Sequence, residues 1–396
     1  MPHLFTEKLD LIKTPSLNKD VRFDFIAKSY NIAKDRHTEY KISSTIKNKE
    51  FLLNYREKDD KFLLKADLIT RISPVGFIKN TLNAYVDATK SNVISSNTSN
   101  VKIRDDIQDV YLKDINYFVD DFQTDKEVQI EIGFGSGRHL IHQAKNNPDI
   151  QFIGLEIHTP SIEQLLKQLH LQNIANVLVV SYDARLFMEF IDSNQVGKIY
   201  VHFPVPWDKK PHRRIYSNEF INEALRVLKV NGTLELRTDS RKYFDYCVEL
   251  LTNLPKGNIS IDINKDLDVS SKYEDRWKKM GKNIYDVVLT SFNEDSPKQI
   301  DKDFSFSKTL DNLDIFDSIS RKPMVFDGYF VHFVNTFVIL GEENSGLLEL
   351  TFGNFDRPVS KYILIKNGKV SYYQGNPIPT SSNSNSHKKI QELIFS

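Results

Sequence analysis

The chain has little of what marks secreted or membrane-spanning proteins, and its charges balance. Its 396 residues include one cysteine, Cys247, which excludes an intramolecular disulfide framework and fits a reducing compartment. No apolar run approaches the roughly 20 residues that cross a bilayer, and residues 1–13 lack the apolar segment of a secretory signal. Lys and Arg total 53, as do Asp and Glu, so a nucleic acid would have to be bound through a local basic patch. We expect a cytoplasmic protein with no membrane contact and no bound metal.

Two β-rich segments flank a central segment of different character. Residues 1–95 are rich in Val, Ile, Phe and Tyr, and the alternation in residues 50–72 predicts β-hairpins. In residues 100–292 strand-like and helical runs alternate, which predicts a mainly parallel, Rossmann-like α/β sheet with crossover helices. Residues 293–396 return to strand patterns. We therefore predict a central domain at 100–292 between β-rich extensions at 1–95 and 293–396.

Polar stretches mark the ends of these segments. Residues 91–100, SNVISSNTSN, are predicted to form a linker. Residues 379–387, PTSSNSNSH, have low complexity and are predicted to be a mobile tail before a short helical end. An Asn-Gly pair at 367–368 predicts a hairpin turn. The β-rich ends permit packing against each other but do not require it.

A glycine loop follows the first strand of the central segment. Residues 128–140 read VQIEIGFGSGRHL and place Glu131, Gly133, Gly135 and Gly137 at a strand-to-helix junction. Glycine at such a junction lets the backbone pass close to a ligand. The alternative is an ordinary tight turn, because a glycine pattern alone is a weak signal.

Acidic residues lie at the carboxyl ends of three successive strands. Glu131 lies at the end of the first strand, Glu156 at the end of the second and Asp183 at the end of the third. Each one alone could be a helix N-cap or a solvated loop residue. Together they lie where open α/β sheets bind ligands, with Glu156 suited to ribose hydroxyls and Asp183 to an exocyclic amine such as that of adenine.

The acid beside the glycine loop bears on which nucleotide is bound. A dinucleotide places its pyrophosphate at the helix N-terminus, where the Glu131 carboxylate would repel it. S-adenosylmethionine carries an ammonium and a sulfonium group and no phosphate. The local chemistry therefore favours a methyl donor over NAD.

A stiff, cationic loop follows the fourth strand. Residues 201–214 read VHFPVPWDKKPHRR, and two prolines restrict the loop backbone. The cluster Lys209, Lys210, Arg213 and Arg214 could bind nucleic-acid phosphates, which supply most nonspecific affinity, or could be a solvated charge run. Trp207 could stack on a base or fill the loop.

These motifs, taken in order, resemble those of the bacterial tRNA (guanine-N7-)-methyltransferase family. The resemblance covers about residues 105–292 and is carried by EIGFGSG, GLEIHTP, NVLVVSYD, FPVPWDKKPHRR, RTDSRKY and SKYEDRWKKMGKNIYDV. It implies a class I methyltransferase fold whose sheet ends in an antiparallel strand, for which residues 285–291 qualify. It also implies methyl transfer from S-adenosylmethionine to N7 of a guanosine in tRNA, at position 46 of the variable loop.

The resemblance also implies roles for individual residues. Cofactor contacts fall on Glu131, Gly133, Gly135, Glu156 and Asp183. Contacts to tRNA or guanine fall on Lys209, Asp239, Lys272 and Glu274. From the residues alone, Asp239 could instead cap the next helix, and residues 271–274 could be a surface loop.

The chain departs from the family pattern at two positions. Val205 stands where the family has an aspartate, and Ser271 stands where it has a threonine. Guanine N7 carries no proton, so its methylation needs no general base and can rest on placement of N7 against the methyl group. A carboxylate could still orient guanine or stabilise its growing charge, and Asp208 could partly take that place. We assign no catalytic residue.

Two other functions remain open from the sequence. One is a catalytically inactive relative that still binds tRNA, because Val205 replaces the family aspartate. The other is a methyltransferase that acts on a small molecule or a protein. The cationic loop and a second run of cations argue against the latter; that run comprises Lys272, Arg276, Lys278 and Lys279.

Overall fold

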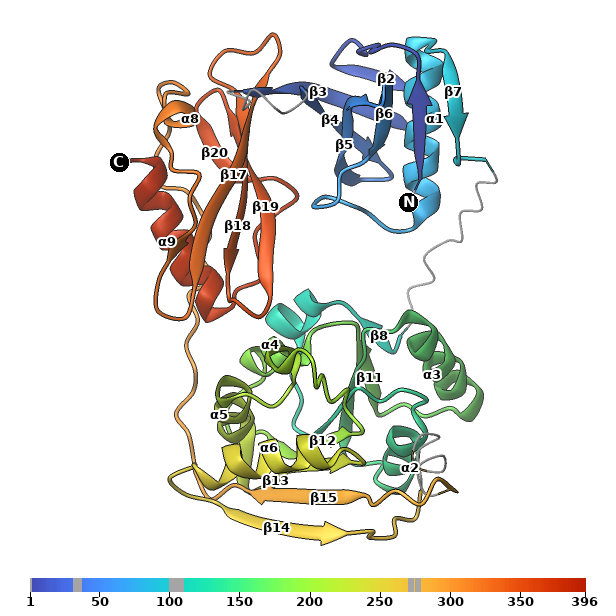
Figure 1. Ribbon diagram of the computed structural model, residues 1–396, viewed down its shortest axis with the longest axis vertical. Helices are drawn as coiled ribbons and strands as arrows, with labels where there is room; N and C mark the ends of the chain where they lie inside the picture. The colour runs from blue at the N-terminus through green and yellow to red at the C-terminus, as the bar shows by residue number, and fades with distance from the viewer. Residues whose placement is uncertain (1, 31–37, 100–109, 270–273, 275–278) are drawn as a thin grey trace. The chain divides into compact units, whose positions relative to one another are not determined.

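The computed structural model describes residues 2–30, 38–99, 110–269, 274 and 279–396 (Figure 1). The chain divides into two compact units. Gln108–Ile300 forms one unit, and Met1–Ile107 together with Asp301–Ser396 forms the other. The two β-rich ends of the chain therefore belong to one unit, which the sequence left open.

The unit of residues 108–300 is built on an eight-stranded sheet. Its strand order is β14-β15-β13-β12-β9-β10-β11-β8. Strands β8 to β13 pair in parallel, whereas β15 runs antiparallel between β13 and β14. The α/β prediction and the antiparallel ending predicted for residues 285–291 are both confirmed. The strands are β8 (Leu112–Lys113), β9 (Val128–Ile132), β10 (Gln151–Leu155), β11 (Val177–Val180), β12 (Val196–His202), β13 (Leu228–Thr238), β14 (Asn258–Ile263) and β15 (Tyr285–Thr290).

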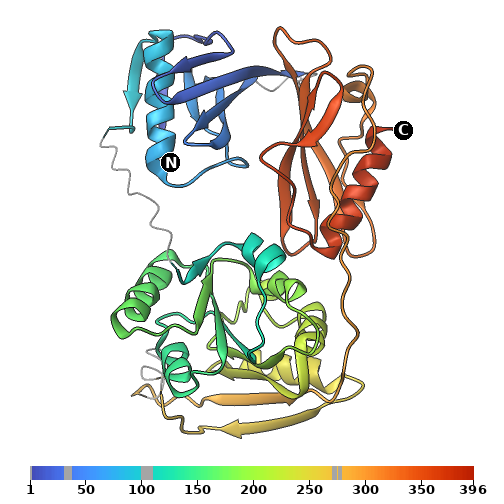
Figure 2. The same ribbon diagram turned by 180° about the vertical axis from the view of Figure 1, so that it is seen from behind.

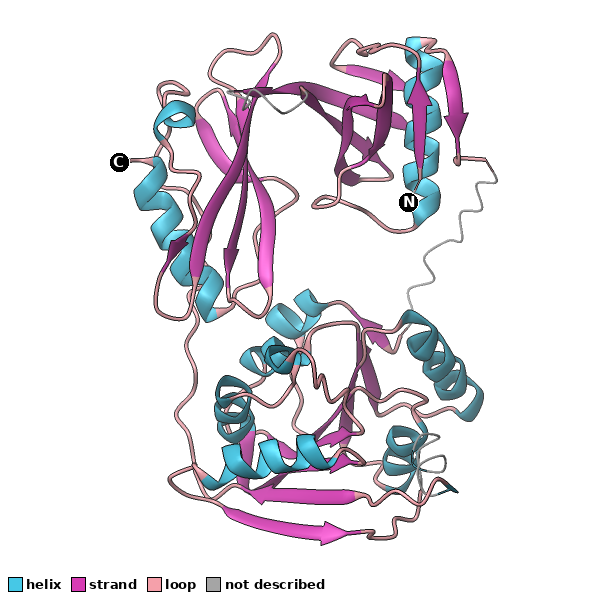
Figure 3. Ribbon diagram, in the orientation of Figure 1, coloured by secondary structure: helices cyan, strands magenta, loops and turns pink. Residues whose placement is uncertain are grey.

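Helices cover this sheet and bury its apolar strands (Figure 3). All five residues of β9 are buried, as expected for a parallel strand with both faces covered. One apolar cluster joins α2 and α3 to β10 and β11, and a larger one joins α5 and α6 to strands β9 to β13 and β15. Cys247 lies in the larger cluster with no exposure, and burial raises the pKa of its thiol. The helices are α2 (Arg138–Asn146), α3 (Thr159–Gln172), α4 (Ala184–Phe187), α5 (Asn218–Val227) and α6 (Arg241–Thr252), with short turns at Tyr117–Asp121, Met188–Phe190 and Pro211–Arg213.

The other unit is a single sheet made from both ends of the chain. Its order is β20-β19-β18-β17-β3-β4-β5-β6-β1-β7, with β16 paired to β17 and β2 to β3. Strand β17 pairs antiparallel with β3, so the two ends of the chain meet in this sheet (Figure 2). In this pairing Thr336 lies opposite Tyr30. Its first part comprises β1 (His3–Thr6), β2 (Ser16–Asn18), β3 (Val21–Tyr30), β4 (Glu39–Ile46), β5 (Lys49–Lys58), β6 (Lys61–Ala66), α1 (Val75–Thr89) and β7 (Val93–Ser96). Its second part comprises α8 (Ile315–Ser318), β16 (Met324–Val325), β17 (Phe330–Ile339), β18 (Gly346–Gly353), β19 (Pro358–Lys366), β20 (Lys369–Tyr372) and α9 (Ser381–Ile394).

A buried polar group and an apolar cluster join the two parts. Lys41 is 3% exposed, and its ammonium lies 2.8 Å from the Asp67 carboxylate. The Tyr362 hydroxyl donates to the same carboxylate at 3.1 Å. Around them, Phe25 and Leu52 of the first part pack in one cluster with side chains of the second, including Phe337, Ile339 and Leu347. The two parts therefore share one apolar cluster, and each also has a cluster of its own.

Three elements differ from the sequence prediction. The stretch predicted as a linker contains the edge strand β7, which pairs with β1. The tail predicted to be mobile is part of helix α9, which Thr380 caps by accepting from the Asn383 amide, and His387 on this helix is buried. Helix α1 was missed although Ile78, Leu82 and Tyr85 recur at helical spacing on its buried face. The Asn-Gly turn is confirmed, since both residues have positive φ.

We predict that removal of residues 301–396 destabilises residues 1–107 but not the α/β unit. The apolar side chains of β3 and β5 lose their partners on β17 and β18, at about 1.5–3 kcal/mol for each large side chain exposed. Limited proteolysis of a fragment 1–300 should leave a resistant product that begins near residue 108. A fragment 108–300 is the matched control and should resist from the start. Equal resistance of residues 1–107 with and without 301–396 would contradict the prediction.

Candidate active site

Parallel strands bring most of the predicted residues to one edge of the sheet. Strands β9 to β13 all run in the same direction, so their carboxyl ends meet there, and we call this the carboxyl edge. The glycine loop follows β9, Glu156 follows β10, Asp183 lies beyond β11, Lys209 beyond β12 and Asp239 follows β13. Lys272 lies outside the described residues. Ligands of open α/β sheets bind at this edge.

The glycine loop leaves open space above the backbone. Gly133, Gly135 and Gly137 have φ of +68°, +52° and +70°, which favours glycine at each position. A Cβ atom at Gly133 would meet no atom within 4 Å, whereas one at Gly137 would lie 2.6 Å from Leu165 Cδ1. Gly137 is therefore needed for packing of α2 on α3, and the backbone at Gly133 remains open to a ligand.

Glu156 holds this loop through backbone amides. Its Oε2 accepts from the Gly135 amide at 3.0 Å, and its Oε1 accepts from the amides of Ile157 and His158 at 2.8 and 3.0 Å. A carboxylate has about four acceptor sites, and three are used here. The side chain is therefore held in place by backbone amides of the protein itself.

Glu131 forms a buried pair with a histidine that sequence reasoning missed. Glu131 is 3% exposed, and its Oε2 lies 2.9 Å from Nδ1 of His139 on α2. Burial lowers the pKa of His139, but the Glu131 carboxylate raises it by more, and the pKa lies above its usual 6.5. The His139 and His202 rings lie 4.5 Å apart, and burial together with His139 lowers the pKa of His202. The sequence feature that could have identified His139 is its position in the first helical turn after the glycine loop.

Asp183 caps helix α4 and pairs with Arg185. It accepts from the Arg185 amide at 3.1 Å, and its Oδ2 lies 2.9 Å from Arg185 Nη2. The helix-cap alternative considered from the sequence is thus realised. A contact from Asp183 to adenine stays a prediction, and the Arg185 guanidinium would adjoin it.

Hydrogen bonds at both ends hold residues 203–207, which we call the proline loop. Phe203 and Trp207 have φ of 50° and 46°, a region that is sparsely populated for bulky residues and costs of the order of 1–3 kcal/mol each. The Phe203 amide donates to the Arg237 carbonyl at 2.6 Å, and Arg214 Nε donates to the Pro206 carbonyl at 2.8 Å. The Lys210 amide donates to the Trp207 carbonyl at 2.8 Å. These bonds offset the backbone strain and fix the direction of the loop.

The cationic cluster divides into an inner and an outer part. Arg214 is 8% exposed, and its guanidinium lies 4.5 Å from the Tyr246 ring centroid. It therefore anchors the loop, which corrects its grouping with the phosphate-binding cations. Lys209, Lys210 and Arg213 are exposed, and Arg213 lies over Trp207 at 5.2 Å. Val205 is 60% exposed at the tip of the proline loop.

The two acids predicted to contact tRNA or guanine differ in exposure. Asp239 is 18% exposed in its side chain, and its Oδ2 lies 2.7 Å from Lys282 Nζ. Glu274 is 1% exposed and pairs with the Arg237 guanidinium at 2.8 Å. Asp239 is thus placed at the surface of the carboxyl edge, whereas Glu274 is turned into the protein.

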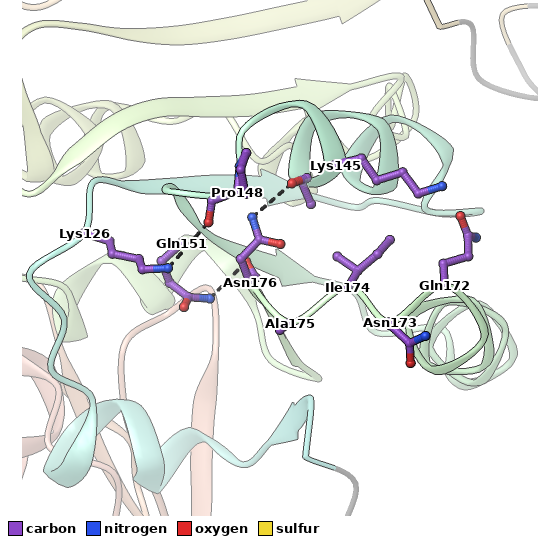
Figure 4. A pocket seen from close by; sticks show the side chains of 10 residues that line it. Lys126, Lys145, Pro148, Gln151, Gln172, Asn173, Ile174, Ala175 and Asn176 are labelled. Carbon is purple, nitrogen blue, oxygen red and sulfur yellow. Dashed lines mark hydrogen bonds between the residues drawn. The ribbon is translucent and has the colours of Figure 1, made fainter.

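A separate pocket of about 410 Å³ lies at the opposite end of the strands (Figure 4). It is lined by residues that precede β9, β10 and β11 or begin them, among them Lys126, Gln151 and Asn176. The Asn176 amide donates to the carbonyls of Ala144, Asn147 and Ile150, each at 3.0 Å. The Asn176 side chain in this lining thus serves local structure. In the described part of the chain, no helix is long and apolar enough to cross a bilayer, and no His, Cys, Asp and Glu group could hold a metal ion.

The strand order and the glycine loop beside acidic strand ends define a class I, S-adenosylmethionine-dependent methyltransferase. Residues 125–287 match a family described as "Putative methyltransferase". The chain is 43% identical to the tRNA (guanine-N(7)-)-methyltransferase of Wolinella succinogenes, over 88% of this chain and 89% of that protein. It is 38% identical to the protein of that name from Helicobacter hepaticus, over 100% and 99%, and 36% identical to that from Campylobacter fetus, over 100% and 99%. The chain belongs to the tRNA (guanine-N7-)-methyltransferase family.

We predict that Glu156→Gln weakens S-adenosylmethionine binding by about 1.5–3 kcal/mol, the worth of a hydrogen bond to a charged group. Glutamine keeps the shape of the side chain, but its single carbonyl oxygen cannot replace two carboxylate oxygens that accept from three backbone amides. Calorimetric titration measures the loss. Glu163→Gln on the exposed face of α3 is the matched control and should bind normally. Unchanged affinity in folded Glu156→Gln would remove this residue from the cofactor site.

We predict that the Glu131–His139 pair stabilises the fold more at low pH than at high pH. Because the folded-state pKa of His139 is raised, this stability is fully present below about pH 6.5 and is lost as the pH rises through the folded value. His139→Gln should lower the free energy of unfolding at pH 6 by about 1.5–3 kcal/mol, and by less at pH 9. Denaturant unfolding of this variant and of His142→Gln, a control on the same helix, measures the difference. A loss that grows with pH would contradict the assignment.

Proposed function

We propose that this chain transfers a methyl group from S-adenosylmethionine to N7 of a guanosine in tRNA, at position 46 of the variable loop. The observation that carries the proposal is the meeting of two motif groups at one sheet edge. The glycine loop and Glu156 follow β9 and β10, while the proline loop and Asp239 follow β12 and β13. Membership of the family supports the substrate and the atom. A cytoplasmic location is part of the proposal, since tRNA is the partner and the chain carries one cysteine.

The residues at the glycine loop fit S-adenosylmethionine. We assign the ribose to Glu156, the ammonium side to Glu131 and the adenine amine to Asp183, with the open backbone at Gly133 and Gly135 beneath the ligand. The buried acid Glu131 favours a cationic ligand over a pyrophosphate. When bound, S-adenosylmethionine supplies the sulfonium methyl group.

The residues beyond β12 and β13 fit a guanosine held in RNA. Lys209, Lys210 and Arg213 are exposed and are assigned to phosphates. Asp239 is assigned to the N1–H and 2-amino groups of guanine, with Lys282 released from it as the base enters. The N7 lone pair forms the new bond to the methyl carbon while the sulfur–methyl bond breaks, and no proton moves. The chain contributes the placement of N7 against the methyl carbon and the negative charge of Asp239 beside the guanine.

Mapping of 7-methylguanosine tests this function directly. Unmodified tRNA transcripts are incubated with the full chain and S-adenosylmethionine, and the modified position is read by chemical cleavage at 7-methylguanosine. We expect cleavage at guanosine 46 and none in a transcript that lacks this guanosine. Modification of another guanosine would contradict the assignment to position 46. If no tRNA contains 7-methylguanosine after the reaction, the chain is better explained as a catalytically inactive relative that binds tRNA.

We predict that Asp239→Asn slows methyl transfer far more than Val205→Ala. Loss of the charge that orients guanine should cost about 2–4 kcal/mol, by analogy with a removed transition-state contact. Val205 is an exposed apolar side chain between two prolines, so its truncation should change the rate by less than about threefold. Single-turnover rates on one tRNA compare the two variants.

The variant Lys282→Met is the control for this comparison. It breaks the ion pair with Asp239 but leaves the carboxylate in place. It should keep a rate near that of the wild type. If Val205→Ala transfers the methyl group much more slowly than the wild type while Asp239→Asn keeps a normal rate, the proposed roles of these two residues are wrong.

A further inference from the structure

Arg237 occupies a central position at the carboxyl edge. It lies near the end of β13, two residues before Asp239, and is 1% exposed. It is among the largest side chains of the described residues that are fully buried. A buried guanidinium is stable only when its donors are paired, so its partners define what it does.

The guanidinium pairs with two carboxylates that lie 37 and 49 positions further along the chain. Its Nη1 donates to both oxygens of Asp286 on β15 at 2.6 Å. Its Nη2 donates to Glu274 Oε1 at 2.8 Å, and its Nε donates to Glu274 Oε2 at 3.3 Å. Nη2 also donates to the Lys265 carbonyl at 2.9 Å. Both oxygens of Glu274 are therefore engaged inside the protein.

The backbone of the same residue supports the proline loop. The Arg237 carbonyl accepts from the Phe203 amide at 2.6 Å, where the strained part of the loop begins. In the β12–β13 register, His202 lies opposite Arg237. One residue thus connects Glu274, the start of the proline loop and the strand end that carries Asp239.

Two explanations of Glu274 predict different energetics. If Glu274 binds the RNA directly, its buried carboxylate must leave Arg237, which then keeps only Asp286 and the Lys265 carbonyl as partners. If Glu274 acts through Arg237, it stays buried and its effect on the RNA is indirect. The 1% exposure of Glu274 and its two-point pairing favour the second explanation.

We propose that Arg237 is a positioning residue for methyl transfer, and that Glu274 acts through it and not by touching the tRNA. This inference rests on the proposed function. Arg237 holds Glu274, Asp286 and Phe203 in one arrangement. The proline loop and the end of β13 that carries Asp239 therefore keep a fixed separation. Its bidentate geometry is the property that matters, because lysine has the charge but cannot form two parallel pairs.

A double-mutant cycle tests the proposal on the full chain. The variants are Arg237→Met, Glu274→Gln and both together, with single-turnover rate, S-adenosylmethionine affinity and melting temperature measured for each. We expect each single change to lower the rate by roughly tenfold or more while cofactor affinity stays within about threefold. The double variant should be no slower than Arg237→Met, because Glu274 then has nothing to act through.

Three results would overturn the proposal. A double variant slowed by the product of the single effects would mean that Glu274 acts on the RNA independently of Arg237. Variants with lowered melting temperature but normal rate would make Arg237 merely structural. Equal losses of rate and cofactor affinity would place it in the cofactor site.

Controls separate this proposal from folding and from the proposed function. Arg226→Met removes a different arginine with little exposure, which pairs with Glu223 and donates to the Ile191 carbonyl, and should leave the rate unchanged. If Arg237→Met does not fold, Arg237→Lys replaces it in the cycle and should be slow despite its charge. If the wild type transfers no methyl group, the proposed function fails, and the same cycle is read on tRNA affinity, where non-additivity still supports Arg237 and additivity overturns it.

Discussion

The carboxyl ends of parallel strands must meet at one edge of a sheet, and the rest of this molecule depends on that constraint. Five strands, β9 to β13, deliver their following loops to the same place although these loops are spread over more than a hundred residues. Methyl donor and acceptor can then be held against each other without any single segment binding both. The antiparallel strand β15 closes the arrangement by bringing Asp286 beside the end of β13.

Each acid at this edge already has a partner inside the protein. Glu131 pairs with His139, Asp183 with Arg185 and Asp239 with Lys282. Glu156 is bound by three backbone amides. We infer that a ligand at this edge would meet carboxylates that are already ordered, which limits the reorganisation that binding requires. An acid that is already oriented contributes more to a charged transition state than one that must first be ordered.

The sequence predicted those features that depend on local pattern. The buried strands follow from continuous apolar runs, and the acids follow from their positions after those runs. Tertiary contacts decided the rest. Arg213 and Arg214 are adjacent and chemically equal, yet one is exposed and the other stacks on Tyr246, because the side chain that meets the aromatic face depends on distant packing. Glu274 was expected to face a substrate, and only its distance to Arg237 places it inside the protein. The helix that replaces the predicted mobile tail needs the C-terminal sheet to bury His387.

We propose that guanine N7 is methylated because the protein places it against the methyl group of S-adenosylmethionine. No general base and no carboxylate at position 205 is needed. The pH dependence of the single-turnover rate, at saturating S-adenosylmethionine and tRNA, tests it most directly. A reaction that moves no proton should change by less than about threefold between roughly pH 6.5 and 8.5. A rate that rises about tenfold per pH unit across this range would show that a base must be deprotonated, and would contradict the account.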